Sequence, residues 1–397
     1  MIDFKTAGES HGKGLVTIVS GFPSNLNIKL DEINAQLIRR QGGYGRGLRM
    51  KIESDRAEII SGVRFGKSIG SPISMIIWNK DWENWRSIMS IDGKGSEVEK
   101  ISVPRPGHAD LVGVAKFNFD DIRNSIERSS ARETAARVAA CSIARIFLAE
   151  FGILIGSFVE SIGGVYPLKN YDPFRKIKID IKNLSNKADN SQVRVLEKDH
   201  EEKIIRKIKS AKKKGDTLGG TFFVIATGLP VGLGSFSSYD SRLDADIAQS
   251  IMSINAVKGV EIGDGFHSSG LLGSEVHDQI SLRGNQLTRK TNRAGGIEGG
   301  ISNGLPLIIR AAMKPIATLM SPVKTVNLKT MREIDARRER SDFVAVPACA
   351  VIAESMTAWI LAKHFMNKFG GDSIEETRDN YINYTQKLFN RIRKNFR

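Results

Sequence analysis

The chain has 397 residues, of which 41% are hydrophobic and 26% charged, a composition typical of a globular protein with a sizeable core. It contains no run of about 18 apolar residues and no basic-then-apolar leader, so we expect neither a membrane span nor a secretory signal. The net charge of +15 favours polyanionic partners, namely nucleic acid, acidic membrane or phosphorylated small molecules. Cys141 and Cys349 form no CxxC pair, which excludes a cysteine zinc site and favours a reducing cytoplasm.

Short β-rich runs alternate with helical runs along the chain. In chain order the pattern predicts a strand at 14–22, a helix at 31–42, a strand at 71–79, a helix at 129–151, a strand at 219–230, a helix at 244–254, a strand at 304–313 and a helix at 351–365. We find no repeat and no Pro/Ser-rich linker. One intertwined α+β unit is therefore predicted in preference to two separable domains.

Local signals refine three of these segments. The helix at 31–42 is expected to carry Asp31 as its N-cap and to bury Ile33, Leu37 and Ile38. The helix at 129–151 is rich in alanine, so another backbone can pack closely against it. The lysine-rich run 201–216 is predicted to be a helix with a solvated basic face.

Glycine-rich segments are frequent, and one of them, "RRQGGYGRGLRM" (39–50), carries four arginines and no carboxylate. Glycine permits close backbone approach and unusual dihedral angles. None of these segments matches a Walker A loop or a Rossmann fingerprint. The usual dinucleotide folds are therefore not indicated. These motifs also do not explain why the segment 39–50, which we call the arginine loop, carries so many cations.

Three further segments carry residue types suited to chemistry. "GESHG" places His11 between glycines on a loop, although a lone loop histidine is most often inert. "RPGHAD" places Arg105 beside His108, a cation that disfavours a second positive charge on the ring. "RSSARETAARVA" (128–139) places hydroxyls and arginines at a predicted helix start, which suits an anion, although a serine N-cap with surface arginines explains it equally well.

Taken together and in this order, the motifs resemble those of the chorismate synthase family. The resemblance covers about residues 7–360 and is carried by "GESHGKG", "RRQGGYGRGLRMKIESD", "GSPISMIIWNKDW", "RPGHADL", "RSSARETAARVAA", "GDTLGG", "INAVKGVEIGDGF", "AGGIEGGISNG", "MKPIATL" and "ERSDFVAVPACAVIAESMTAW". It implies a β-α-β sandwich core, which we place at residues 1–370. A basic tail follows at 371–397, and it is expected to be either an amphipathic helix or an interaction tail. We expect a chain ending near Asp379 to fold and turn over.

The resemblance also implies a reaction. Family members convert 5-enolpyruvylshikimate 3-phosphate into chorismate and phosphate by anti-1,4-elimination, with reduced FMN as a cofactor that is not consumed. NADPH enters only indirectly, for flavin reduction. Because substrate and flavin both carry phosphate, an enclosed site needs several fixed cations, and arginine supplies planar bidentate donors. The arginine loop is then expected to order over bound ligands as a lid.

Roles carry over from the family segment by segment. His11 is the expected acid for the leaving phosphate, His108 is expected beside the flavin ring, and Asp342 is expected to manage a proton near flavin N5. Expected cofactor-binding residues are Arg128, Ser129, Ser130, Asn255, Ala256, Gly299, Lys314, Pro315, Ile316, Ala317, Thr318 and Arg340. Expected substrate- or NADP-binding residues are Arg40, Arg46, Arg49, Arg105 and Arg132.

The remaining expectations concern partners and alternatives. The resemblance implies a cytoplasmic homotetramer, and we favour a monofunctional enzyme that receives reduced FMN from a separate flavin reductase. We expect no nucleic-acid and no membrane partner. A nucleic-acid-binding protein would interleave aromatic residues with its basic patch, whereas Tyr44 is alone in its loop. A flavin-dependent oxidoreductase using the same pocket is the second alternative. His200 and His364 are predicted to lie on helix surfaces, and His267 and His277 to flank glycine-rich loops.

Overall fold

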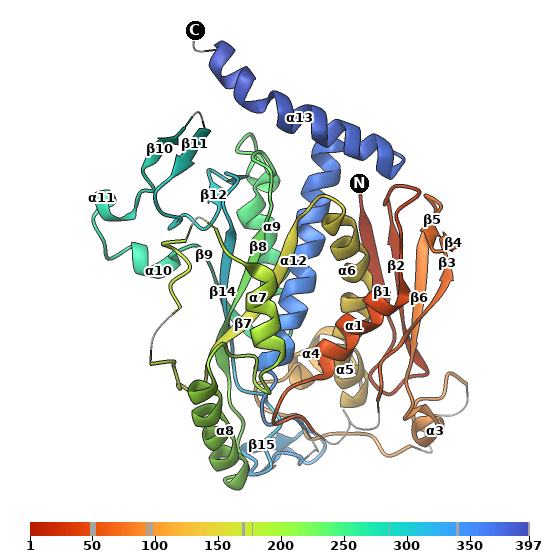
Figure 1. Ribbon diagram of the computed structural model, residues 1–397. Coiled ribbons are helices and arrows are strands. Elements are labelled where there is room, and N and C mark those ends of the chain that lie inside the picture. The colour runs from red at the N-terminus through yellow and green to blue at the C-terminus, as the bar shows by residue number, and fades with distance from the viewer. Residues whose placement is uncertain are drawn as a thin grey trace.

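Two four-stranded antiparallel sheets form the outer layers of the protein, and helices fill the space between them (Figure 1). The first sheet contains β1 (Asp3–Ala7), β2 (Gly14–Ser20), β6 (Ile73–Trp78) and β3 (Ala57–Ser61), in that order. The second contains β7 (Leu154–Ile162), β8 (Gly220–Thr227), β14 (Leu307–Met313) and β9 (Val257–Ile262). The computed structural model describes residues 1–47, 53–92, 95, 98–168, 171–176, 178–284, 286–338 and 341–395.

The two sheets differ in how their residues alternate. In β2, Leu15, Thr17 and Val19 face the core while Ile18 points outward, which is the period-two pattern of a sheet covered on one face. In β8, five consecutive residues at 222–226 are buried, because the second sheet is covered on both faces. The far face is covered by α7 (Ile181–Asp189), which packs against β7 and β8.

The middle layer is built on α1 (Leu30–Gln41), α6 (Thr134–Ala149), α9 (Leu243–Met252) and α12 (Val346–Phe369). The small side chains of α6 let α1 and α12 pack closely on it, as its alanine content predicts. Helix α12 is apolar and long enough to cross a bilayer, but 94% of its apolar window is buried inside the protein. It is therefore the core helix of a β-α-β sandwich, the fold class that the sequence indicates.

Shorter elements surround this sandwich. The remaining helices are α3 (Trp82–Trp85), α4 (Asp110–Phe117), α5 (Ile122–Ser129), α8 (Lys198–Lys213), α10 (Gly265–Ser268), α11 (Gly273–Val276) and α13 (Ile374–Asn395), with 3-10 turns η2 (Ala131–Glu133) and η3 (Tyr239–Ser241). Four small hairpins pair β4 (Val63–Arg64) with β5 (Lys67–Ser68), β10 (Ile280–Arg283) with β11 (Gln286–Arg289), β12 (Ile297–Glu298) with β13 (Ile301–Ser302), and β15 (Lys324–Asn327) with β16 (Arg332–Asp335).

Several local predictions need correction. Helix α1 begins at Leu30, so Asp31 lies in its first turn rather than at the cap, and Ile38 is 61% exposed. The helix predicted at 129–151 is interrupted at Ser130, whose backbone is extended and whose hydroxyl accepts from the N–H of Arg132. Serine competes with helical hydrogen bonding in this way.

The two histidines predicted on helix surfaces are instead buried. His200 lies at 4% exposure, with its Nε2 3.1 Å from the carbonyl oxygen of Val165. His364 lies at 7% exposure, with its Nε2 3.0 Å from a carboxylate oxygen of Asp246. Both therefore carry structural contacts that spacing alone does not reveal.

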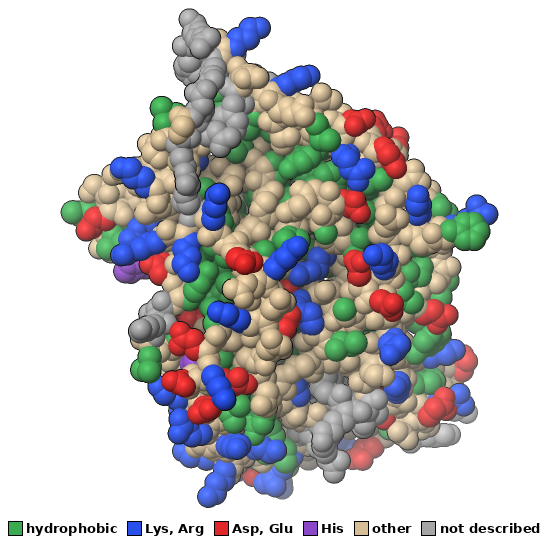
Figure 2. All heavy atoms as spheres, viewed as in Figure 1, with side chains coloured by type: hydrophobic (Ala, Val, Ile, Leu, Met, Phe, Trp, Pro, Cys, Tyr) green, Lys and Arg blue, Asp and Glu red, His purple; other side chains and the backbone are tan. Residues whose placement is uncertain are grey.

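The basic run 201–216 forms α8, as predicted, with Ile204 and Ile208 buried and its lysines directed to solvent. Figure 2 shows Lys and Arg side chains gathered at the lower left of the molecule, where Figure 1 places α8. Part of the +15 charge is thus an ordinary solvated helix face.

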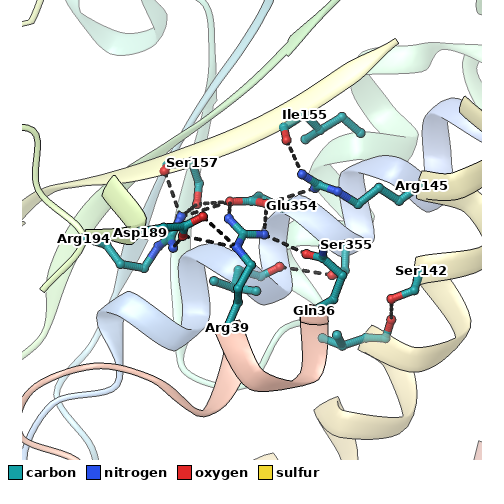
Figure 3. A network of polar contacts seen from close by, with 12 residues as sticks. Gln36, Arg39, Ser142, Arg145, Ile155, Ser157, Asp189, Arg194, Glu354 and Ser355 are labelled. Atoms are coloured by element: carbon teal, nitrogen blue, oxygen red, sulfur yellow. Dashed lines mark hydrogen bonds and ion pairs between the residues drawn. The ribbon is translucent and has the colours of Figure 1, made fainter. Parts of the chain in front are cut away.

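A buried charge network ties the middle layer to the second sheet (Figure 3). The carboxylate of Glu354 on α12 is fully buried and accepts from Arg39 at 2.7 and 2.9 Å, from Arg145 at 2.9 Å and from Arg194 at 3.2 Å. Ser157 of β7 donates to the same carboxylate at 2.6 Å. Burial alone would raise the pKa of Glu354, but the surrounding arginines outweigh it and lower the pKa to about 2.

Candidate functional site

The "GESHG" motif forms the turn between β1 and β2, where Asn79 holds its backbone. The side-chain amide of Asn79 donates to the carbonyl oxygen of Gly12 at 2.7 Å. Gly8 has φ +108°, and a Cβ there would lie 2.4 Å from the carbonyl oxygen of Gly14. Only glycine fits such a position. The sequence thus builds a tight, fixed loop around His11.

The ring of His11 is held on two sides. Its Nδ1 lies 2.9 Å from Oε1 of Glu127, and its backbone N–H donates to Oε2 of the same carboxylate at 2.7 Å. The indole of Trp85 stacks on the ring at 3.9 Å between centroids, with planes 23° apart. Glu127 lies on α5, 116 residues from His11 in the chain. Neither Glu127 nor Trp85 was singled out by the sequence.

Asp55 organises two of the predicted anion-binding arginines beneath this loop. Arg132 donates to Asp55 Oδ1 at 2.5 Å and to Asn79 Oδ1 at 2.8 Å, while Arg40 donates to Asp55 Oδ2 at 3.2 Å. Both guanidinium groups are about 4% exposed. The pKa of Arg40 is lowered to about 10, because burial and the cations Arg132 and Arg46 outweigh the attraction of Asp55. The two arginines form the floor of the site, and direct anion binding by them stays a prediction.

The "RPGHAD" motif forms a second cluster around a fully buried carboxylate, that of Asp110. Arg105 donates to Asp110 at 2.9 and 3.0 Å, and Nδ1 of His108 lies 2.5 Å from Asp110 Oδ1. Burial would raise the pKa of Asp110, but the hydrogen bonds from His108 and Arg105 lower it below its ordinary value. Asp110 thus offsets the charge of Arg105 next to His108, a compensation that the sequence interpretation overlooked.

The predicted cofactor segment 314–318 packs against this second cluster. Arg105 also donates to the hydroxyl of Thr318 at 3.3 Å. The ammonium group of Lys314 donates to the carbonyl oxygen of Gly107. A Cβ placed on Gly107 would lie 3.7 Å from the Cβ of Ala317, and the carbonyl oxygen of Ile316 accepts from Thr217 at 2.7 Å. Pro315 is exposed beside them.

Asn255 and Ala256 connect the two clusters. The amide of Asn255 donates to the carbonyl oxygen of Ser129 at 3.0 Å, and the backbone N–H of Lys314 donates to the carbonyl oxygen of Ala256 at 2.9 Å. Ser130 donates to the hydroxyl of Ser10 at 3.1 Å, beside His11. Five segments far apart in the sequence therefore meet around one site. The buried Oδ1 of Asn255 has no hydrogen-bond partner among the described residues.

The described part of the arginine loop contacts the third predicted catalytic residue. Asp342 accepts from the backbone N–H of Gly47 at 2.6 Å, and a guanidinium nitrogen of Arg46 lies 3.2 Å from its Oδ2. The N–H of Phe343 donates to the carbonyl oxygen of Gly45 at 2.9 Å. The loop is thus fastened to the segment that carries Asp342, at least over residues 42–47.

Some predicted residues are placed differently or fall outside the description. Arg128 ends α5 and donates to the carbonyl oxygens of Gly8 and Thr6 at 3.1 and 3.0 Å, with its side chain 46% exposed. Gly299 lies in the β12–β13 turn, next to Gly300, whose carbonyl oxygen accepts from the N–H of Leu243 at the start of α9, and its cofactor role stays a prediction. The positions predicted for Arg49 and Arg340 lie outside the described residues.

A cavity of about 1040 Å³ lies beside α5. It is lined by residues of the segment 87–103 and of the β15–β16 hairpin, together with Arg123 of α5. The guanidinium group of Arg123 lies 5.2 Å from the Trp85 ring and 3.9 Å from the carboxylate of Glu127. None of the three predicted catalytic residues lines the cavity, so we place the site at the clusters rather than in this hollow. A smaller cavity near His277 is lined by residues 262–298, away from both clusters.

Comparison with known proteins agrees with this arrangement. A family model described as chorismate synthase matches residues 2–366. The chorismate synthase of Chloroherpeton thalassium is 55% identical over 390 residues, covering 98% of this chain and 100% of that protein. The chorismate synthase of Aquifex aeolicus is 50% identical over 392 residues, covering 97% and 98%. A crystal structure of a chorismate synthase superposes with a TM-score of 0.80 at 41% identity and 98% coverage of both chains. The resemblance read from the motifs is therefore confirmed.

Proposed function

The chain belongs to the chorismate synthase family, and on that premise we propose that it is a lyase that converts 5-enolpyruvylshikimate 3-phosphate into chorismate and phosphate by anti-1,4-elimination. This reaction is the last step of the shikimate pathway and feeds aromatic amino-acid biosynthesis. The observation that carries the proposal is the meeting of distant segments around His11 and His108, through the contacts Ser130 to Ser10, Asn255 to Ser129 and Lys314 to Ala256.

The residues at and between the two clusters fit a bound flavin nucleotide. Lys314 and Arg128 supply cations for a phosphate, and the unpaired buried Oδ1 of Asn255 is an acceptor that a ring N–H would satisfy. We propose that Ser129, Ser130 and residues 314–318 hold the remainder of reduced FMN. When bound, that group supplies an electron-rich ring that assists phosphate departure without net oxidation.

The protein's own residues divide the remaining work. His11, anchored through Nδ1 on Glu127, delivers a proton to the leaving phosphate. His108, anchored on Asp110 beside Arg105, places a polar ring next to the flavin site. Asp342, held by Gly47 and Arg46, receives the proton that leaves the substrate ring. Arg46 and the buried pair Arg40 and Arg132 surround these groups with positive charge, which suits a substrate with two carboxylates and a phosphate.

Product analysis without oxygen tests this proposal. Purified protein is mixed with 5-enolpyruvylshikimate 3-phosphate and chemically reduced FMN, and phosphate and chorismate are quantified. With reduced FMN we expect phosphate and chorismate in equal amounts. When the FMN remains oxidised, we expect neither product. Phosphate without chorismate would indicate a phosphatase, and the absence of both products with an intact fold would refute the proposed reaction.

We also propose the family's cytoplasmic homotetramer, with reduced FMN supplied by a separate reductase. The β10–β11 hairpin extends from the body (Figure 1) and exposes Ile280 and Leu282 at 68% and 71%. Apolar side chains clustered on such a projection are typical of subunit contacts. Light scattering should give about four times the chain mass of 43.7 kDa, and a monomer at micromolar concentration would exclude this assembly.

A further inference from the structure

We propose that Glu127 is the positioning residue that fixes the ring of His11 and keeps a proton on its Nδ1. This inference rests on the proposed function, in which His11 acts as the acid, and it assigns a role to a residue that no motif identifies. Glu127 does not touch the reacting atoms. Its effect would reach the reaction only through His11.

The carboxylate of Glu127 uses both of its oxygens on a single residue. Oε2 accepts the backbone N–H of His11 at 2.7 Å, while Oε1 lies 2.9 Å from ring Nδ1. The carbonyl oxygen of Glu127 also accepts the N–H of Ser10 at 3.1 Å. The Glu127 side chain is 1% exposed, so water does not compete for these contacts. One residue of α5 thus fastens the catalytic loop at three points.

The surroundings of His11 leave the ring one orientation. Trp85 of α3 stacks on it at 3.9 Å. Among the described residues, the charged groups that face this pair include the carboxylate of Glu127 and, 3.9 Å from it, the guanidinium group of Arg123 on α5, which also lies over Trp85. A ring rotated by half a turn would lose its hydrogen bond to Glu127. Its Nε2 is therefore the nitrogen that exchanges a proton with the substrate.

The contact has a direct chemical consequence. An ionised carboxylate only accepts hydrogen bonds, so Nδ1 facing it must carry hydrogen in both charge states of the ring. In the transfer step the Nε2–H bond breaks, an O–H bond forms on the departing phosphate, and a neutral ring protonated at Nδ1 remains. This is the arrangement in which a buried acid orients a catalytic histidine and stabilises its cation.

Glu127→Gln tests the proposal with almost no change of shape. Glutamine is neutral and replaces one of the two acceptor oxygens with an NH2 donor, so His11 loses its counter-charge and one of its two Nδ1 contacts, at 2.9 and 3.1 Å. We expect kcat to fall about 10²–10⁴-fold. The alkaline limb of the pH–rate profile should move to lower pH, because the protonated ring loses its counter-charge. Glu127→Asp, which keeps the charge, should retain a profile like that of the wild type with an intermediate rate.

A second buried glutamate provides the matched control. Glu354→Gln removes a similarly buried, hydrogen-bonded carboxylate that contacts neither histidine of the site. It should lower the thermal unfolding midpoint and leave the pH–rate profile unchanged. If Glu127→Gln behaves like Glu354→Gln, or retains the wild-type rate, the positioning role is refuted.

A readout independent of turnover separates this inference from the proposed function. Ring ¹⁵N NMR of histidine-labelled protein, with the His11 signals assigned by their loss in His11→Asn, reports which nitrogen carries hydrogen. We expect protonated Nδ1 in the neutral ring of the wild type and a mixture of tautomers in Glu127→Ala. A wild type that shows the fixed tautomer but forms no chorismate would contradict the proposed function alone. Equal tautomer populations in wild type and Glu127→Ala would overturn the positioning role.

Discussion

Arg46 is the arginine of the loop that contacts Asp342, a predicted catalytic residue. Its guanidinium group is 11% exposed and lies 3.2 Å from Asp342. We expect Arg46→Ala to lower kcat/KM by the equivalent of about 2–5 kcal/mol, since it removes a largely buried charge partner. Steady-state kinetics with reduced FMN measure this change.

The matched control for Arg46 is Arg206 on α8, which is exposed on the solvated basic face. Arg206→Ala removes the same charge from the molecule and should leave kcat/KM unchanged. If both variants lose activity equally, the effect belongs to the net charge of the protein. If neither variant loses activity, Arg46 does not act on the bound substrate or cofactor.

Glu354 allows a prediction about pH and stability. Its pKa is about 2 in the folded protein, below the value near 4.3 of an unfolded chain. Its ionised form therefore stabilises the fold above about pH 4.3, and this contribution is lost as pH falls toward 2. We expect the unfolding free energy of the wild type to exceed that of Glu354→Gln by about 3 kcal/mol at pH 7.

Urea unfolding of both proteins at pH 7 and pH 3 measures this difference. The difference in unfolding free energy between the two proteins should be smaller at pH 3 than at pH 7. A gap that stays constant from pH 7 to pH 3 would show that the arginines do not hold Glu354 ionised.

At the scale of secondary-structure elements, the local sequence pattern predicts the strands and the core helices. It does not predict where these elements are interrupted. The alternation in β2 and the alanine content of α6 are visible in the sequence and are reproduced in the fold. The break between α5 and α6 depends on Ser130, whose hydroxyl satisfies one backbone N–H and contacts Ser10. The local pattern predicts one helix from residue 129, with a serine N-cap at its start, and it does not predict α5, which ends at Ser129.

The C-terminal helix α13 gives a prediction at the same scale. Tyr381 packs on Phe151, Phe365 and Phe369, each at 5.4 Å between centroids, and Tyr384 packs on Phe369 at 5.6 Å. From these contacts we expect the dispensable part of the tail to begin after Tyr384, later than the position near Asp379 that the sequence suggests. We expect a chain ending after residue 385 to unfold at the wild-type temperature.

A chain ending after residue 379 should lose about 3–5 kcal/mol, because three phenylalanines lose their cover. Thermal unfolding compares the two truncations directly. If both shortened chains were as stable as the wild type, the aromatic contacts of α13 would contribute nothing, and if both were destabilised to the same extent, residues 386–397 would be part of the fold.

For the whole molecule, the sequence predicts the site's reactive residues but not the groups that hold them. His11, His108 and Asp342 each lie in a recognisable local motif. Asp110 is two residues from His108, so an H-x-D spacing in a turn could have revealed it. Glu127 and Asp55 are different. His11 lies 116 residues from Glu127, while Arg132 and Arg40 lie 77 and 15 residues from Asp55, and only the packed sandwich brings these groups together. Such contacts depend on tertiary structure and leave no local signal.

The central claim concerns the whole enzyme: an elimination in which reduced flavin is required yet not consumed. Substrate and product of the proposed reaction differ by phosphate and a proton, so no electrons leave the system. The direct test is stoichiometry in the absence of oxygen, with FMN reduced in advance, substrate in large excess and the flavin spectrum recorded throughout. We expect each equivalent of reduced FMN to support many molecules of chorismate and to remain reduced at the end. One reduced flavin oxidised for every chorismate formed would make the protein an oxidoreductase and contradict the account.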